Sequence, residues 1–176
     1  QFCPELYGLM DLRERIIKRP VITTVEVLAN PIVGKKTHFV TGYVHKAYPP
    51  IYAVLCEKVG FHSTLLIRGI EGGVVPSLRQ KGLMISYHGG VEKDRIDTDP
   101  KLLGINSELR AIAFPKRFEN DREREFLAQY VVDLGRSALS GESGMFYDSL
   151  VYTSSLILWH LRKYRSVEEQ AFQKGL

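Results

Sequence analysis

The chain is poor in cysteine and has no long apolar run, and each shortage excludes a class of protein. Two cysteines, Cys3 and Cys56, occur in 176 residues. That number is too small for a disulfide framework and predicts buried, inert thiols in a reducing cytoplasm. No apolar stretch approaches the roughly 20 residues of a membrane-spanning helix, and the first residues show no signal-peptide pattern. We therefore expect no membrane partner.

Common catalytic signatures are also missing. The sequence contains no lysine-bearing phosphate loop and no dinucleotide-binding fingerprint. The segment 140–144 lacks the spacing of a serine-hydrolase elbow and is expected to join two helices. We therefore assign no catalytic residue from motifs.

Metal-binding patterns are equally weak. The aspartates at 94, 97 and 99 lack the glycine and final glutamate of a calcium loop. The histidines show no i, i+4 pair with a carboxylate partner, which argues against zinc, and the one beside Trp159 is expected to be structural. We assign no metal ligand. The five histidines are His38, His45, His62, His88 and His160.

The composition is that of an ordinary globular domain, with 44% hydrophobic and 25% charged residues. The net charge of +4 is unevenly placed. Residues 1–118 hold 17 Lys and Arg against 11 Asp and Glu, whereas residues 119–176 hold 7 against 9. This asymmetry is compatible with a polyanionic partner. We expect one domain over residues 1–176.

Hydrophobic periodicity predicts strands first and helices later. Residues 37–44 and 62–67 have strand character and flank a helix that Pro49 opens and Gly60 ends. Residues 83–96 are expected to form a hairpin around a glycine pair. The chain turns helical from Glu119 on, with a break at 140–144. This order predicts an α/β fold with a mostly parallel sheet.

The stretch from Leu65 to Pro76 is the most informative one. An apolar strand runs directly into a loop with glycines at positions 69, 72 and 73. Glycine allows positive φ and close backbone approach, and ligands of α/β sheets usually bind at the carboxyl ends of strands. We therefore expect a ligand site here.

Two basic segments are candidates for binding anions. The first helix carries a basic cluster that suits either a carboxylate or phosphate ligand or simply solvent and the helix dipole: Arg13, Arg15, Lys18 and Arg19. The second segment carries Lys35, Lys36 and Lys46 among histidines and tyrosines. There, lysines could hold phosphates while aromatic rings stack on bases, or the lysines could protect a solvated strand edge.

The order of these signals resembles the anthranilate phosphoribosyltransferase family, glycosyltransferase family 3. The similarity extends over most of the chain and depends on the order of its motifs more than on any one of them. The motifs are Leu12-Arg13, Arg19-Pro20, Asn30-Pro31, Gly42-Tyr43-Val44, Arg68-Gly69-Ile70-Glu71-Gly72 and the late segment from Asp148 to Leu161.

The resemblance implies the later part of the large α/β domain of that fold, with C-terminal helices. It also implies a homodimer in the complete protein, whose helical dimerisation domain and phosphoribosyl pyrophosphate loop would lie upstream. Because both ends look cut, we expect this chain to be a fragment. Arg13 matches the arginine that contacts the acceptor carboxylate in the family, and Arg68, Gly69 and Glu71 lie in its substrate loop.

The sequence departs from the family at the metal site. The acidic pair that holds magnesium falls on Val74 and Val75, and valine cannot ligate Mg²⁺. The Arg-Gly-x-Glu-Gly form resembles a divergent branch, outside tryptophan synthesis, that is associated with nucleic-acid binding. The leading hypothesis is therefore a phosphoribosyltransferase-like protein that binds single-stranded nucleic acid through a basic groove. The nucleic-acid contacts would be Lys18, Arg19, Lys35, Lys36 and Lys46, with Arg13 available to another anion.

Two other interpretations stay open. The first is an active pentosyltransferase that uses phosphoribosyl pyrophosphate on an unknown acceptor, with Glu71 supplying a substitute oxygen for magnesium. Magnesium is expected as a cofactor only in that case. The second is a scaffolding relic that binds neither ligand.

Overall fold

The computed structural model describes residues 4–16, 22–32, 34–112 and 124–161. Its centre is a four-stranded sheet in the order β1-β2-β3-β4. The strands are β1 (His38–Gly42), β2 (Ser63–Ile67), β3 (Gly82–His88) and β4 (Val91–Thr98). β1 and β2 are parallel, and the other two pairings are antiparallel.

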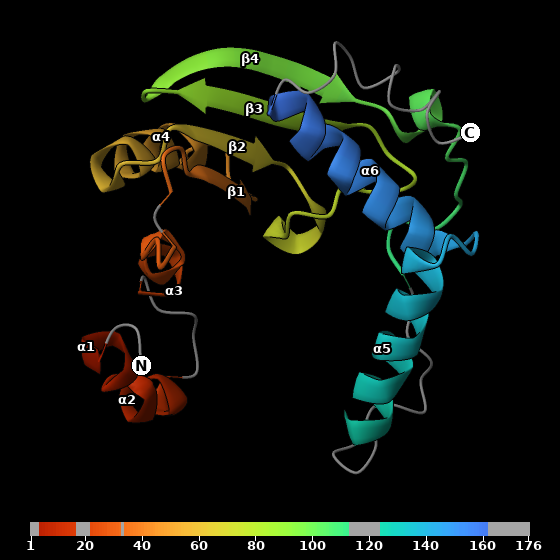
Figure 1. Cartoon of the computed structure of the whole chain (residues 1–176), viewed down its shortest axis with the longest axis horizontal. Helices are drawn as coiled ribbons and strands as arrows, with labels where there is room; N and C mark the ends of the chain where they lie inside the picture. The colour runs from red at the N-terminus through yellow and green to blue at the C-terminus, as the bar shows by residue number, and fades with distance from the viewer. Residues whose placement is uncertain (1–3, 17–21, 33, 113–123, 162–176) are drawn as a thin grey trace.

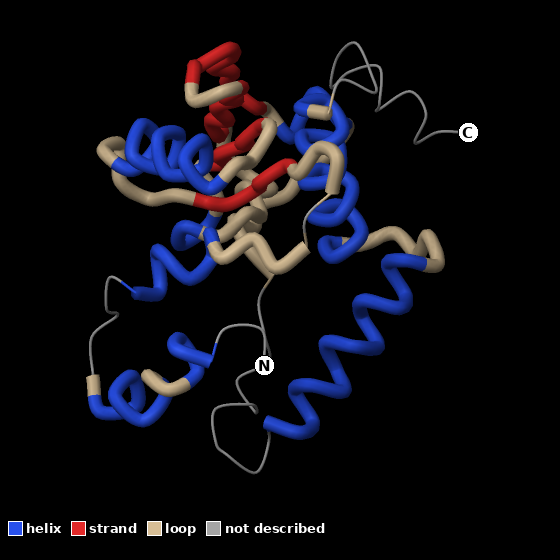
Figure 2. The backbone as a smooth tube through the Cα atoms, turned by 60° about the vertical axis from the view of Figure 1, so that its left-hand side comes forward, coloured by secondary structure: helices blue, strands red, loops and turns tan. Residues whose placement is uncertain are grey.

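One helix covers each face of the sheet (Figures 1 and 2). α4 (Tyr48–Val59) begins at a proline pair in its first turn and ends at Gly60, whose φ of 95° is the left-handed value that glycine tolerates. α6 (Met145–His160) lies on the opposite face. Its buried side chains follow one helical stripe: Ser149, Tyr152, Ser155, Leu156 and His160.

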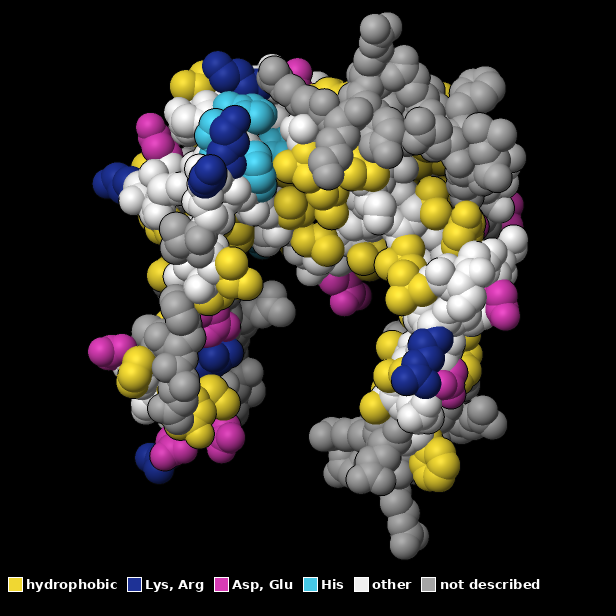
Figure 3. All heavy atoms as spheres, in the orientation of Figure 1, with side chains coloured by type: hydrophobic (Ala, Val, Ile, Leu, Met, Phe, Trp, Pro, Cys, Tyr) yellow, Lys and Arg dark blue, Asp and Glu magenta, His cyan; other side chains and the backbone are white. Residues whose placement is uncertain are grey.

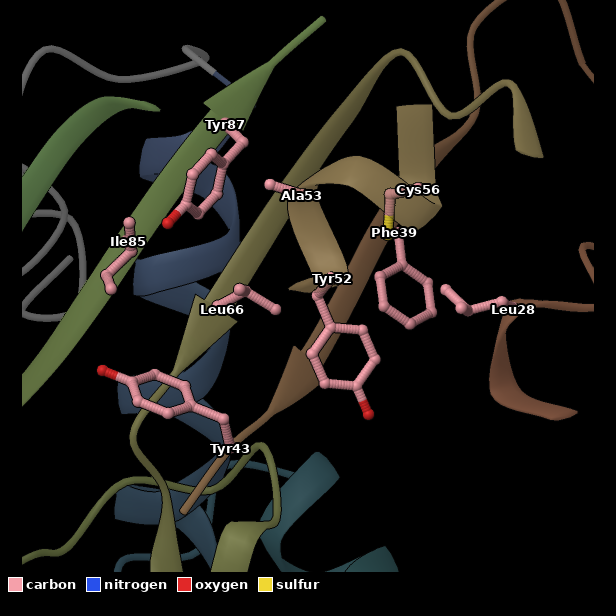
Figure 4. Close-up of a cluster of buried hydrophobic side chains, with 9 residues drawn as sticks. All are labelled: Leu28, Phe39, Tyr43, Tyr52, Ala53, Cys56, Leu66, Ile85 and Tyr87. Carbon is pink, nitrogen blue, oxygen red and sulfur yellow. The ribbon is translucent and has the colours of Figure 1, made fainter. Parts of the chain in front are cut away.

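The alternation of side chains along β2 divides the interior into two cores. All five residues of β2 are buried, as expected for a strand covered on both faces. Leu66 faces α4 in the first core, which Figure 4 shows, and Leu65 faces α6 in the second. The first core is formed by Leu28, Phe39, Tyr43, Tyr52, Ala53, Cys56, Leu66, Ile85 and Tyr87.

The remaining helices form two arms on the same side of the sheet (Figure 1). One arm contains the short helices α1 (Pro4–Tyr7), α2 (Met10–Arg15) and α3 (Ile22–Val25), followed by the 3-10 turn Glu26–Leu28. The other is α5 (Arg124–Leu139), which joins α6 through the loop at 140–144. The 3-10 turns Ile70–Gly72 and Pro100–Leu103 complete the described elements.

The α/β fold is confirmed, and so are the hairpin and the helix–helix loop. The expectation of a mostly parallel sheet is wrong for the described strands, of which only β1 and β2 pair in parallel. A parallel neighbour needs a crossover long enough to return the chain to the same edge, usually through a helix. Residues 68–81 contain only a short 3-10 turn, so β3 starts at the edge where β2 ends and runs back beside it.

The first predicted helix also differs, because it is interrupted at Gly8–Leu9 between α1 and α2. Within the residues described, no helix has the length and apolar character required to cross a bilayer. Cys3 lies outside the described residues.

Candidate functional site: a basic pocket after β2

The loop after β2 is held in place by contacts between glycines. An added Cβ on Gly69 or on Gly42, at the end of β1, would overlap the carbonyl group of Gly73. Backbone therefore packs directly on backbone at the carboxyl ends of two neighbouring strands. Ile70 N donates a hydrogen bond to Val75 O at 2.9 Å and closes the loop. This packing explains why the sequence needs glycine here.

The tip of the loop has an uncommon backbone conformation. Glu71 has a φ of 51°, which non-glycine residues seldom adopt, and Gly72 has a φ of 83°. Gly72 also packs against the side chain of Val44. Glu71 is exposed at this tip, whereas the loop as a whole is fixed against the end of β1.

A pocket of about 510 Å³ opens beside this loop at the same edge of the sheet. Its lining comes from both ends of the connection between β2 and β3, from the end of β4 and from residue 110. Ser77 Oγ accepts hydrogen bonds from the backbone N–H groups of Arg79 (3.3 Å) and Gln80 (3.1 Å), which shapes the turn. The lining residues are Arg68, Gly69, Ile70, Ser77, Gln80, Lys81, Gly82, Leu83, Asp97 and Arg110.

The charge of the pocket is predominantly positive. The lining includes three cations, Arg68, Lys81 and Arg110, and one carboxylate, Asp97. Lys81 Nζ also lies 3.3 Å from Asp99 Oδ2. The pKa of Asp99 is lowered, first by the backbone N–H of Lys101 and then by Lys81. Two guanidinium groups in one pocket suit a phosphate or carboxylate, because each can donate two parallel hydrogen bonds.

The structure separates the predicted anion-binding residues. Arg68 and Gly69 line the pocket, and Glu71 lies on its loop. Arg13 is on α2, where its guanidinium makes two hydrogen bonds to the carboxylate of Glu26 at 2.7 and 3.2 Å. Arg110 and Lys81 were not identified from the sequence, because neither belongs to a motif near the glycine loop.

The predicted nucleic-acid contacts also lie at different places. Lys35 and Lys36 precede β1, whereas Lys46 follows it, so they are at opposite edges of the sheet. Lys46 shares the edge of the pocket, beside the stacked rings of His45 and Tyr48. Lys18 and Arg19 lie outside the described residues.

The loop does not fit the magnesium site of the resembled family. Val74 and Val75 occupy the positions of the acidic pair, and neither side chain has an oxygen. Among the described residues, no three His, Cys, Asp or Glu side chains are placed to hold a metal ion. Glu71 is therefore a single carboxylate without a set of partner ligands in this part of the chain.

A second polar cluster, which the sequence analysis missed, lies at the opposite edge of the sheet. Four histidine rings meet there, with centroids 5.2 to 6.4 Å apart. Figure 3 shows a patch of histidine side chains at the surface beside Lys and Arg side chains, whereas His160 of this group is buried. We call this group the histidine cluster: His38, His62, His88 and His160.

Hydrogen bonds connect the cluster to the sheet and to α6. Ser63 Oγ lies 2.6 Å from His38 Nδ1 and 2.7 Å from His160 Nε2. His160 Nδ1 lies 2.8 Å from Ser86 Oγ. His160 is 1% exposed and is thus held between β2 and β3. Burial, followed by the positive charges of His62 and Lys36, lowers the pKa of His38.

Strand register could have revealed this cluster. His38 is paired with Ser63, and Ser63 is paired with His88, so the three form a row across neighbouring strands. Side chains in such a row point to the same face. Sequence spacing alone left the histidines scattered, because the row depends on the pairing of separate strands.

The first core contains a cysteine whose burial makes its thiol unreactive. Cys56 is buried, and that burial raises the pKa of its thiol, while a hydrogen bond with Thr64 acts in the opposite direction. A thiol with a raised pKa is a weak nucleophile at neutral pH. The expectation of a buried, inert Cys56 is consistent with this environment.

Comparison with known proteins gives one relative and no family. No family model matches the chain. A protein of Aquifex aeolicus (strain VF5), named "Uncharacterized protein", is 32% identical over 169 residues. The alignment covers 96% of this chain and 49% of that protein. The chain thus spans about half the length of the curated relative it matches.

Proposed function

We propose that the chain binds single-stranded nucleic acid and that the pocket after β2 holds a backbone phosphate. One observation carries this proposal: Arg68 and Lys81, at the two ends of the connection between β2 and β3, line the same pocket as Arg110. Cations that converge in this way supply the electrostatic attraction and the multiple donors that a phosphate needs.

The neighbouring surface supports a polymeric ligand. Lys46 follows β1 at the same edge as the pocket, and the rings of His45 and Tyr48 are stacked beside it, 5.8 Å apart. A partly exposed aromatic ring next to a lysine can stack on a base while the lysine contacts the adjoining phosphate. The proposed interface therefore runs from the pocket to Lys46. Lys35 and Lys36, at the opposite edge, would contact only a longer strand.

The experiment is a fluorescence-anisotropy titration with a labelled single-stranded oligonucleotide at low and moderate salt. We expect Arg68→Ala and Arg110→Ala to weaken binding about tenfold each and to reduce the salt dependence by about one phosphate contact. Arg136→Ala, on the exposed surface of α5, is the matched control and should bind like the parent chain. Equal affinity of all four proteins would remove the pocket from the proposed interface.

A second candidate is a pentosyltransferase that places phosphoribosyl pyrophosphate in this pocket. The same cations would then hold the donor phosphates, which is the observation that favours it. The loop lacks the family's acidic pair, and the described residues offer no set of metal ligands, so leaving-group stabilisation would fall to Arg68 and Arg110.

A competition experiment distinguishes nucleic-acid binding from the pentosyltransferase. Phosphoribosyl pyrophosphate with Mg²⁺ should leave oligonucleotide binding unchanged if the pocket serves nucleic acid alone. Displacement of the oligonucleotide, together with pyrophosphate release on addition of an acceptor, would favour the transferase. Cytoplasmic location and a homodimer in the complete protein belong to the same proposal, and the buried thiol of Cys56 is consistent with a reducing compartment.

A further inference from the structure

We propose that the histidine cluster is an acid-sensitive latch that fastens the end of α6 to the sheet at neutral pH and releases it on acidification. The latch is independent of the ligand that the pocket binds. It depends on where the four rings lie and on which elements they join.

The latch joins elements that are far apart in the sequence. His160 is the last residue of α6, and its two ring nitrogens lie within hydrogen-bond distance of Ser63 on β2 and Ser86 on β3. Ser63 also lies within hydrogen-bond distance of His38 on β1. Three strands and one helix therefore meet through two serines and two imidazoles.

A cluster of imidazoles changes its net charge over the mildly acidic range. Neutral rings can pack at centroid distances of 5.2 to 6.4 Å without repulsion. Each added proton places a positive charge against the neighbouring rings, and His160 lies where little solvent screens it. Repulsion within the cluster therefore rises as the pH falls.

Two charged groups around the cluster disfavour an added proton, and one favours it. Lys36, which precedes β1, and His62, which precedes β2, both disfavour a proton on His38. On the side of β3, the carboxylate of Glu57 from α4 lies against Gly90, in the turn that follows His88. This carboxylate would attract a cation on that side of the cluster.

The helix end itself opposes release. His160 stands in the last turn of α6, where the helix carbonyl groups attract a positive charge. That attraction acts on His160 alone and falls off within a turn, whereas the repulsion involves all four rings. The sign for His38 is clear: its pKa in the folded chain is lowered from 6.5, so its stabilising contribution is present above that value and is lost as the pH falls below it.

The test is hydrogen–deuterium exchange of the whole chain between about pH 7.5 and about pH 5. Amides of α4 serve as the internal reference, because α4 covers the opposite face and the intrinsic exchange rate cancels in the ratio of α6 to α4 protection. We expect this ratio to fall by about tenfold on acidification. A fluorescence change of Trp159, the only tryptophan, should accompany the fall in the ratio.

Three variants make the test decisive. His160→Gln should hold the ratio within about twofold over the same range, because glutamine can hydrogen-bond but does not titrate there. If that variant does not fold, His38→Asn should shift the midpoint to lower pH by removing one charge from the cluster. His45→Asn removes a histidine that lies outside the cluster and stacks on Tyr48, and it should leave the pH dependence of the exchange ratio unchanged. A ratio independent of pH in the parent chain, or an unchanged midpoint in His38→Asn, would overturn the latch.

Discussion

Gly69 and Gly73 pack so closely that a side chain on Gly69 would occupy the space of the Gly73 carbonyl group. The φ of Gly69 is −87°, which any residue can adopt, so the requirement for glycine is steric. We predict that Gly69→Ala lowers the free energy of unfolding by about 3 kcal/mol, since backbone must move to admit the methyl group. Urea unfolding followed by circular dichroism measures this loss.

Gly135 provides the control for that substitution. It lies within α5, and an added Cβ would meet nothing within 4 Å. Alanine there should raise the free energy of unfolding by about 0.5–1 kcal/mol, because it restricts the unfolded chain and favours the helix. Equal effects of the two substitutions would contradict the steric argument.

Arg13 is predicted to stabilise the fold and not to bind the ligand. Its guanidinium pairs with Glu26, and both side chains are about one-third exposed or less. A double-mutant cycle with Arg13→Ala and Glu26→Ala should give a coupling free energy of about 0.5–1 kcal/mol. Oligonucleotide affinity should be the same in Arg13→Ala as in the parent chain. A tenfold loss of affinity would return Arg13 to the binding site.

Charge reversal at Lys35 and Lys36 probes the extent of the proposed interface. These lysines lie at the opposite edge of the sheet from Arg68, so a short oligonucleotide that fills the pocket should not reach them. We predict that Lys35→Glu with Lys36→Glu leaves the affinity for a short strand nearly unchanged and weakens binding of a longer one. Anisotropy titrations with the two lengths measure this. Unchanged affinity and salt dependence at both lengths would exclude these lysines from the interface.

Two buried tyrosines predict a loss of stability in alkali. Burial is the main reason why the pKa of Tyr87 and the pKa of Tyr152 rise from 10.0 to about 12. The unfolded chain then releases its phenolic protons at a lower pH than the folded chain. The tyrosine contribution is therefore complete below pH 10.0 and is lost as the pH rises toward about 12.

Tyr152→Phe should reduce this alkaline loss, because phenylalanine has no proton to release. Urea unfolding at neutral and alkaline pH measures the change. Tyr48→Phe, at a partly exposed position, is the matched control and should keep the pH dependence of the parent chain. If both variants behaved alike, the deprotonation of Tyr152 would not be a cause of the loss.

Local signals were sufficient for most elements of the fold. The prolines that open α4 and Gly60 that ends it act within a few residues, and so does the glycine pair of the β3–β4 turn. Expectations that depended on distant partners were less successful. The direction of β3 depended on how the chain returns after residue 68, and a parallel sheet was wrongly expected there.

For the candidate site too, local signals were sufficient and contacts between distant residues were not predicted. Arg68 and Gly69 were predicted from their own loop, but Arg110 reaches the pocket from more than forty residues later. The partner of Arg13 is thirteen residues away, on a different helical element. The histidine row required the register of three strands, which only the folded sheet defines.

The strand order also has a consequence for how the sheet assembles. Each strand pairs with its successor in the chain, so β1 with β2 and β3 with β4 can form from contiguous segments. The β3–β4 hairpin closes a short loop and is reached early in folding, whereas the parallel pair of β1 and β2 needs α4 to return the chain. α6 must instead return from residue 145 to cover strands that begin at residue 38. We infer that docking of this helix is the late step, and that an unfinished chain exposes the face of the sheet that α6 later covers.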